Sequence, residues 1–151
     1  MTQVSFYTLS SADQESRRQL ACRLAEKALH LGHRVFIQVD SQEQARQLDT
    51  LLWHFKSTSF LPHSIAQSGQ SRNESGMSES SATEKLIIGT ADNQGQFEDV
   101  FINLSSSPCQ RHERYQRINE ILSADPEELE QGRQSYRFYQ QHGFKPETHK
   151  L

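Results

Sequence analysis

Two runs of consecutive apolar residues limit the fold of this 151-residue chain more than any other feature. The runs are KLIIGT at residues 85–90 and DVFINL at residues 99–104. Strands with one face in water alternate apolar and polar residues, whereas strands covered on both faces are apolar almost throughout. The two runs therefore predict buried strands inside a sheet that has helices on both sides.

Other strands and helices are predicted to alternate along the chain. Residues 4–9, VSFYTL, and residues 34–39, RVFIQV, have the β-branched and aromatic content of strands. Between them, apolar residues recur at three- and four-residue steps over residues 13–32, as on one face of a helix. A second helix is predicted over residues 41–53. This alternation favours a single α/β domain over residues 1–151, with a mostly parallel sheet flanked by helices.

The second half of the chain is predicted to contain two more helices. Residues 109–123, CQRHERYQRINEILS, carry apolar side chains at helical spacing. The last helix is predicted to begin at Asp125, with Pro126 at its first position and Glu128 closing a capping box. Between the two halves, residues 64–84 are rich in Ser, Gln and Gly and predict an exposed, mobile loop.

The overall composition argues against several classes of function. The net charge is −3, without the concentrated basic face that binding to nucleic-acid phosphates usually needs. No apolar run approaches the roughly 20 residues that cross a bilayer, and residues 1–15 lack the pattern of a secretory signal. The two cysteines, Cys22 and Cys109, do not make a disulfide framework. We therefore expect a cytoplasmic protein that binds neither DNA directly nor a membrane.

A nucleotide site is not expected in this Rossmann-like fold. Such a site needs a glycine-rich turn, because the backbone must approach the phosphates closely. The turn after the first strand, SSADQESRR, has no glycine, and neither GxGxxG nor GxxxxGK[ST] occurs in the chain. Cys109 with His112, and His30 with His33, are only pairs, whereas zinc takes about four ligands. No catalytic residue, metal or cofactor is predicted, and an enzyme or nucleotide-binding protein using the crevice at the strand carboxyl ends is the alternative.

The segment RQSYRFYQQHGF places aromatic and basic side chains on the last predicted helix. At 100° per residue its aromatic side chains do not share one face. One arrangement leaves Arg133, Tyr136 and Arg137 together on the surface and buries Phe138. The opposite arrangement buries Tyr136 and Tyr139 and exposes Phe138, and the periodicity does not distinguish the two. In the first arrangement the arginines could hold a carboxylate beside the tyrosine ring.

A second aromatic segment, LLWHFKSTSFLPH, follows the second predicted helix. It contains Trp53, Phe60 and Pro62. This apolar surface could pack under the sheet as part of the core. It could equally form a contact with another protein, because exposed aromatic residues concentrate binding energy.

Five segments, in order over residues 1–145, resemble the chi subunit family of bacterial DNA polymerase III. They are VSFYTL, RVFIQVDSQEQARQLDTLLWHF, SFLPH, VFINLS and GRQSYRFYQQHGF. The resemblance implies an α/β fold similar to nucleotide-binding domains but without nucleotide binding or catalysis. It also implies an adaptor in DNA replication that links the clamp loader, through the psi subunit, to the C-terminal tail of single-stranded DNA-binding protein.

The resemblance assigns site residues as well. Arg133 matches the arginine expected at the terminal carboxylate of the tail, and Tyr136 and Arg137 match the positions beside it. Leu122 matches an apolar position that lines the pocket. Family members can carry a lysine where this chain has Leu129, and the loss of that charge would weaken attraction for an acidic tail.

The second partner face implied by the resemblance lies in the aromatic segment after the second helix. Trp53 and Phe60 match aromatic positions associated with the psi subunit, and Pro62 belongs to the same segment. A repair helicase is a further candidate partner of this face.

Overall fold

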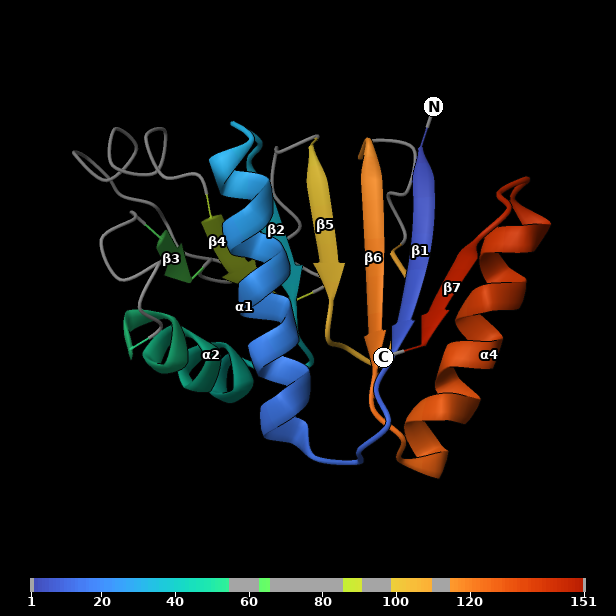
Figure 1. Cartoon of the computed structure of the whole chain (residues 1–151), viewed down its shortest axis with the longest axis horizontal. Coiled ribbons are helices and arrows are strands. Elements are labelled where there is room, and N and C mark those ends of the chain that lie inside the picture. Colours follow the sequence, from blue (N-terminus) through green and yellow to red (C-terminus); the bar gives the residue numbers. More distant parts are fainter. Residues whose placement is uncertain (1, 55–62, 66–85, 91–98, 110–114, 151) are drawn as a thin grey trace.

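A seven-stranded parallel sheet forms the centre of the described part of the chain (Figure 1). The computed structural model describes residues 2–54, 63–65, 86–90, 99–109 and 115–150, with side chains placed except at 52–54 and 63–65. The strand order is β3-β4-β2-β5-β6-β1-β7, and every neighbouring pair is parallel. The strands are β1 (Gln3–Thr8), β2 (Val35–Gln38), β3 (His63–Ile65), β4 (Leu86–Gly89), β5 (Val100–Asn103), β6 (Arg117–Leu122) and β7 (Glu147–Lys150).

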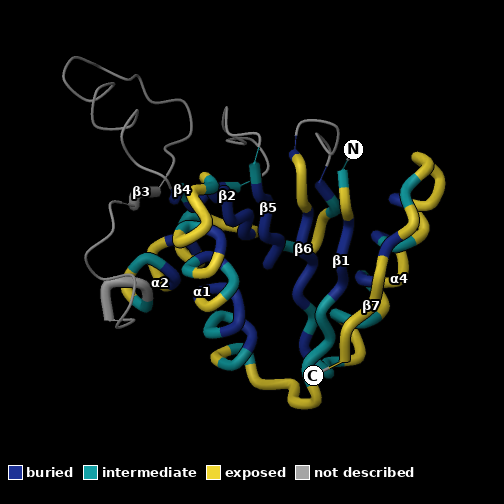
Figure 2. Tube along the Cα trace, turned by 45° about the horizontal axis from the view of Figure 1, so that its top comes forward, coloured by how far each residue is buried: buried dark blue, intermediate teal, exposed yellow. Residues whose placement is uncertain are grey.

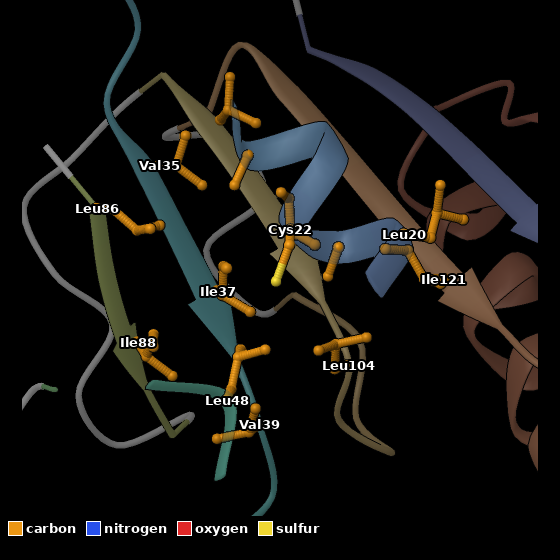
Figure 3. Packing of buried hydrophobic residues seen from close by; sticks show 14 of the residues in the cluster. Leu20, Cys22, Val35, Ile37, Val39, Leu48, Leu86, Ile88, Leu104 and Ile121 are labelled. Atoms are coloured by element: carbon orange, nitrogen blue, oxygen red, sulfur yellow. The ribbon is translucent and has the colours of Figure 1, made fainter. Parts of the chain in front are cut away.

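Three described helices cover the two faces of the sheet. Helices α1 (Gln14–His30) and α2 (Gln42–His54) contribute to one apolar cluster, and α4 (Pro126–Gln141) contributes to the other. Figure 3 shows the first cluster, in which side chains of α1, α2 and the sheet meet. This three-layer arrangement confirms the predicted α/β class. No helix in the described ranges has the length and apolarity of a membrane span.

The apolar run DVFINL is buried on both faces, as predicted. On β5, Val100 and Ile102 lie in the α1–α2 cluster, whereas Phe101 between them lies in the α4 cluster. All three side chains are buried. In the run KLIIGT, Ile87 on β4 is half-buried and packs against the α4 cluster. Because successive side chains of a strand point to opposite faces, a strand placed inside a three-layer fold has no exposed position.

The helix predicted over residues 109–123 is wrong, because Arg117–Leu122 form strand β6. This segment pairs with β1 on one side and β5 on the other. Its apolar residues Ile118 and Ile121 are three apart, which fits one face of a helix and also the two opposite faces of a strand. Pairing with two neighbouring strands decided between these possibilities, because tertiary contacts override weak local preference. Residues 110–114 lie outside the described part of the chain.

Strands β3 and β7 were not predicted from the sequence. Ser64 and Ile65 of the predicted mobile loop belong to β3, and residues 66–84 of that loop lie outside the described residues. Strand β7, with the sequence ETHK, is exposed along its whole length and pairs with β1 at the edge of the sheet. An exposed polar edge strand has no apolar pattern from which it could be predicted.

Candidate functional site

The start of α4 is fixed to the end of β6 by hydrogen bonds. Asp125 caps the helix, and its Oδ2 accepts hydrogen bonds from the backbone N–H groups of Glu127 at 3.1 Å and Glu128 at 3.2 Å. The Glu128 carboxylate accepts hydrogen bonds from the backbone N–H and the hydroxyl of Ser123, at 3.0 and 2.6 Å. The predicted N-cap is therefore confirmed, but Glu128 reaches back to Ser123 and not to the amide of the cap residue.

A glycine lets α4 approach β6 closely. Gly132 is buried, and a Cβ atom at this position would lie 2.3 Å from Cδ1 of Leu122. Leu122 is half-buried at the end of β6 and is in the α4 cluster. The candidate pocket residue Leu122 is therefore held directly against the helix that carries the candidate arginines.

The described structure combines features of both arrangements considered for α4. Tyr139 is fully buried, and its ring lies 5.5 Å from that of the half-buried Phe138. Tyr136 is half-buried, with its ring 5.3 Å from that of Phe6 on β1. Arg133 and Arg137 are exposed on the outer side of the helix, which Figure 2 shows as largely exposed. The two arginines therefore border an aromatic side chain that is only partly covered.

Tyr136 is also held through its hydroxyl group. The hydroxyl donates a hydrogen bond to the carbonyl oxygen of Pro146 at 3.3 Å, just before β7. With one ring contact and one hydrogen bond, this side chain has a defined orientation. It can therefore present a fixed apolar edge to a ligand without losing much rotamer freedom on binding.

Arg133 forms one surface ion pair. Its Nη1 lies 2.8 Å from Oε1 of Glu130, and the two side chains are 63% and 54% exposed. An ion pair between exposed side chains contributes only about 0–1 kcal/mol, since water and salt screen it. Arg133 can therefore exchange Glu130 for a carboxylate that is held more firmly by additional contacts.

The second predicted face cannot be built from described side chains. Trp53 belongs to α2, but its side chain is not among those described. Phe60 and Pro62 lie outside the described residues. The placement of these three residues at a partner interface stays a prediction.

Sequence reasoning missed a buried polar group under α4. Glu120 is 3% exposed, and its Oε2 accepts hydrogen bonds from the Tyr139 hydroxyl at 2.6 Å and from Asn103 Nδ2 at 2.8 Å. Burial raises the pKa of the Glu120 carboxyl from 4.5 to about 7. The only sequence signal was an acidic residue within the apolar run INEIL. Because this run was assigned to a helix, the burial of Glu120 was not predicted.

A crevice of about 280 Å³ lies at the carboxyl ends of the strands, where nucleotide-binding proteins of this class hold their ligand. Its described lining includes four carboxylates, those of Asp40, Asp125, Glu127 and Glu128. The guanidinium group of Arg17 in the lining donates a hydrogen bond to the Ile121 carbonyl at 2.8 Å and pairs with Glu128 at 3.3 Å. Excess negative charge opposes the binding of a phosphate, which the alternative nucleotide-binding function would require.

The candidate metal ligands are not gathered into a site in the described ranges. Of the first pair, Cys109 is buried and His112 lies outside the described residues. Cys22, the other cysteine, is also buried, and burial raises the pKa of its thiol to about 12. His30 lies 3.7 Å from Glu26 on the surface of α1. Among the residues that the structure describes, no three His, Cys, Asp or Glu side chains are grouped as metal ligands would be.

Comparison with solved structures supports the fold described above. A DEAD-box protein from the hyperthermophile Methanococcus jannaschii has a similar structure, with a TM-score of 0.68 and 14% sequence identity. The similarity covers 98% of this chain and 42% of that protein chain, and it concerns the fold alone. The protein is thus an α/β protein of the Rossmann-like class.

Sequence comparison identifies the family. The family model for "DNA polymerase III chi subunit, HolC" matches residues 1–147. DNA polymerase III subunit chi of Pseudomonas aeruginosa is 32% identical over 151 residues, which cover all of this chain and 98% of the relative. The Escherichia coli subunit chi is 39% identical over 51 residues, 34% of this chain and 35% of that relative. The chain belongs to the DNA polymerase III chi subunit family.

Proposed function

We propose that this protein is a non-catalytic adaptor of the DNA polymerase III holoenzyme. In this function, α4 binds the acidic, phenylalanine-ending C-terminal tail of single-stranded DNA-binding protein. A second face, with Trp53, Phe60 and Pro62, binds the psi subunit and through it the clamp loader. A repair helicase is a further candidate partner of the second face.

The proposed contact between α4 and the tail is supported by one observation. Arg133 and Arg137 are exposed on α4 beside the half-buried Tyr136, and Leu122 lies against the same helix at Gly132. An arginine can donate two parallel hydrogen bonds to a terminal carboxylate. The tyrosine ring and the leucine supply apolar surface for the last side chain of the tail, while Arg137 attracts its acidic residues.

Weak binding is sufficient for such an adaptor. An affinity in the micromolar range corresponds to about 8 kcal/mol. Many tails are present along a coated single strand, so the effective concentration near each bound adaptor is high. The contact can therefore hold the polymerase assembly near the template while it still exchanges between tails.

The first experiment is a calorimetric titration with a peptide that ends in acidic residues and phenylalanine. We expect Arg133→Ala to weaken binding by about 10- to 100-fold, since hydrogen bonds to charged groups contribute about 1.5–3 kcal/mol. Binding should also weaken as salt is raised, because the attraction between opposite charges is screened.

Two matched controls make this titration specific. Arg23→Ala removes an exposed cation from α1 and should leave the affinity unchanged. A peptide with an amidated C-terminus lacks the terminal charge, and it should bind the wild-type protein as weakly as the free peptide binds Arg133→Ala. Equal affinity of the wild-type protein and Arg133→Ala for the free peptide would refute the assignment.

A further inference from the structure

A groove of about 460 Å³ lies on the sheet face opposite to α4. Helix α1 packs over β2, β5 and part of β6, and in Figure 1 no helix lies in front of β1 and β7. The groove runs beside α1 over β6 and β1, from Asp99 and Arg117 towards Tyr7. Its wall on the α1 side includes Leu24 and Leu31. None of the residues assigned to the tail contact on α4 lines it.

A buried amide oxygen lies unsatisfied among the residues that line this groove. Asn119 on β6 is only 4% exposed, and its Oδ1 has no hydrogen-bond partner within the part of the chain that the structure describes. Buried polar atoms are paired in nearly all folded proteins, so an exception needs an explanation. The same side chain carries an oxygen acceptor and two N–H donors. The Asn119 side chain can therefore bind a ligand that offers both a hydrogen-bond donor and a hydrogen-bond acceptor.

The charged side chains of the groove favour an anion. Lys27 and Arg117 are exposed, and neither forms an ion pair with another residue in the described ranges. Asp99, the one acidic residue in the described lining, already accepts a hydrogen bond from the backbone N–H of Arg34 at 2.7 Å and pairs with the Arg34 side chain at 3.8 Å. The available charge of the groove is thus positive.

The apolar lining favours a peptide over a nucleobase. It is mainly aliphatic, and Leu31 at the end of α1 is 67% exposed. Tyr7, the one Phe, Tyr or Trp residue in the described lining, is already stacked on His149, with ring centroids 5.0 Å apart and 21° between the planes. Bases are usually held by free aromatic faces, whereas a peptide brings aliphatic side chains and a backbone amide with one donor and one acceptor.

We propose that this groove binds an extended, acidic and apolar peptide segment of a partner protein, as a second site independent of α4. Asn119 pairs with one backbone amide of the segment. Arg117 and Lys27 hold an acidic side chain, and Leu24 with Leu31 contacts an apolar one. A free C-terminus is not required, because the recognised groups are backbone amides and side chains.

The test uses a peptide of alternating Asp and Leu that is acetylated at its N-terminus and amidated at its C-terminus. In a titration of the isotope-labelled full chain followed by NMR, we expect the amide signals of residues 27–31 and 117–119 to shift. We expect Arg117→Glu to weaken binding about ten-fold or more, as loss and reversal of one charge contact would. Arg23→Glu makes the same charge change on α1 outside the groove lining and should leave the affinity unchanged.

Further variants separate this site from the one on α4. Asn119→Leu should abolish binding of the blocked peptide while the chain remains folded, and Arg133→Ala should not affect it. Shifts confined to α4, or no shifts up to millimolar peptide, would overturn the proposal. Adenosine monophosphate is titrated in the same way. If it shifts the amide signals of the groove residues and the peptide does not, the peptide proposal is wrong and the groove binds a nucleotide. The effect of Arg133→Ala on tail binding is measured in a separate titration, so the groove proposal and the tail-binding proposal can each fail while the other holds.

Discussion

Glu120 shows how one residue can couple the fold to pH. Its carboxyl is buried between Tyr139 and Asn103, and its pKa is raised to about 7 chiefly because burial disfavours the charged form. The ordinary value of 4.5 applies in the unfolded chain. Between these values the folded protein keeps a proton that the unfolded chain releases. The contribution of Glu120 to stability is therefore fully present below pH 4.5 and is lost as the pH rises to about 7.

We expect Glu120→Gln to remove this dependence, because the amide is neutral at every pH. The difference in unfolding free energy between the variant and the wild-type protein should change by up to about 1.4 kcal/mol per pH unit within this window. Urea unfolding from pH 5 to pH 8 measures it. The exposed Glu127→Gln serves as a control and should give a constant difference over this range. A constant difference for Glu120→Gln as well would show that Glu120 is already ionised in the fold.

Asn119 is the second residue whose burial has a measurable consequence. An unsatisfied buried polar group costs about 1–3 kcal/mol. Asn119→Leu removes this group and places apolar atoms beside Leu24 and Val100 in the groove lining. We expect the variant to be more stable than the wild-type protein by about that amount, measured by chemical unfolding. A less stable variant would show that the amide oxygen is satisfied in solution.

At the scale of elements, the contact between α4 and β6 depends on Gly132. Gly132→Ala would place a methyl group 2.3 Å from Leu122 Cδ1, so the leucine must rotate or the helix must move outward. Overpacking costs about 1–3 kcal/mol, and the better helix propensity of alanine returns about 1 kcal/mol. We expect a net loss of stability of about 0–2 kcal/mol and weaker tail binding, measured by unfolding and by titration.

A double variant tests the cause of this loss. Leu122→Ala removes the side chain that the new methyl group would contact, so the stability costs of Leu122→Ala and Gly132→Ala should not add. Gln134→Ala on the exposed side of the same helix should change neither stability nor binding appreciably. Additive costs of the two substitutions would mean that they do not act through their mutual contact.

At the scale of the whole molecule, the sheet separates the proposed partner faces. Helix α2, which contains Trp53, packs on the face opposite to α4. Because the sheet lies between them, a change at one face should leave the other intact. We expect Trp53→Ala to release the psi subunit in a pull-down and to keep full affinity for the tail peptide in a titration.

The reciprocal variant completes this test. Arg133→Ala should keep the psi subunit and bind the tail peptide about 10- to 100-fold more weakly. The opposite result for the two variants would mean that the two faces have been exchanged. Loss of both partners in either variant would point to unfolding, which circular dichroism distinguishes.

Local patterns in the sequence determined most of the elements. The four strands that read as apolar runs, the two helices after the first and second strands, and the Asp125 cap of α4 were predictable because each depends on neighbours within a few residues. Membership of the chi family could likewise be anticipated, since it rests on short motifs in a fixed order. The sequence pattern also fixed the angular positions of Arg133, Tyr136 and Arg137 on their helix.

Only the tertiary structure decided which elements contact one another and which side chains these contacts bury. The helical period gives the angle between two side chains, but packing decides which side of the helix faces the sheet. The packing of α4 buries Tyr139 and leaves Arg133 exposed. Pairing with β1 and β5 turned Arg117–Leu122 into a strand. That pairing also buried Asn119 on one face and Glu120 on the other. The strand structure of β6 and the burial of its side chains depend on contacts between residues about a hundred positions apart, such as those between β1 and β6. No local sequence pattern encodes these contacts.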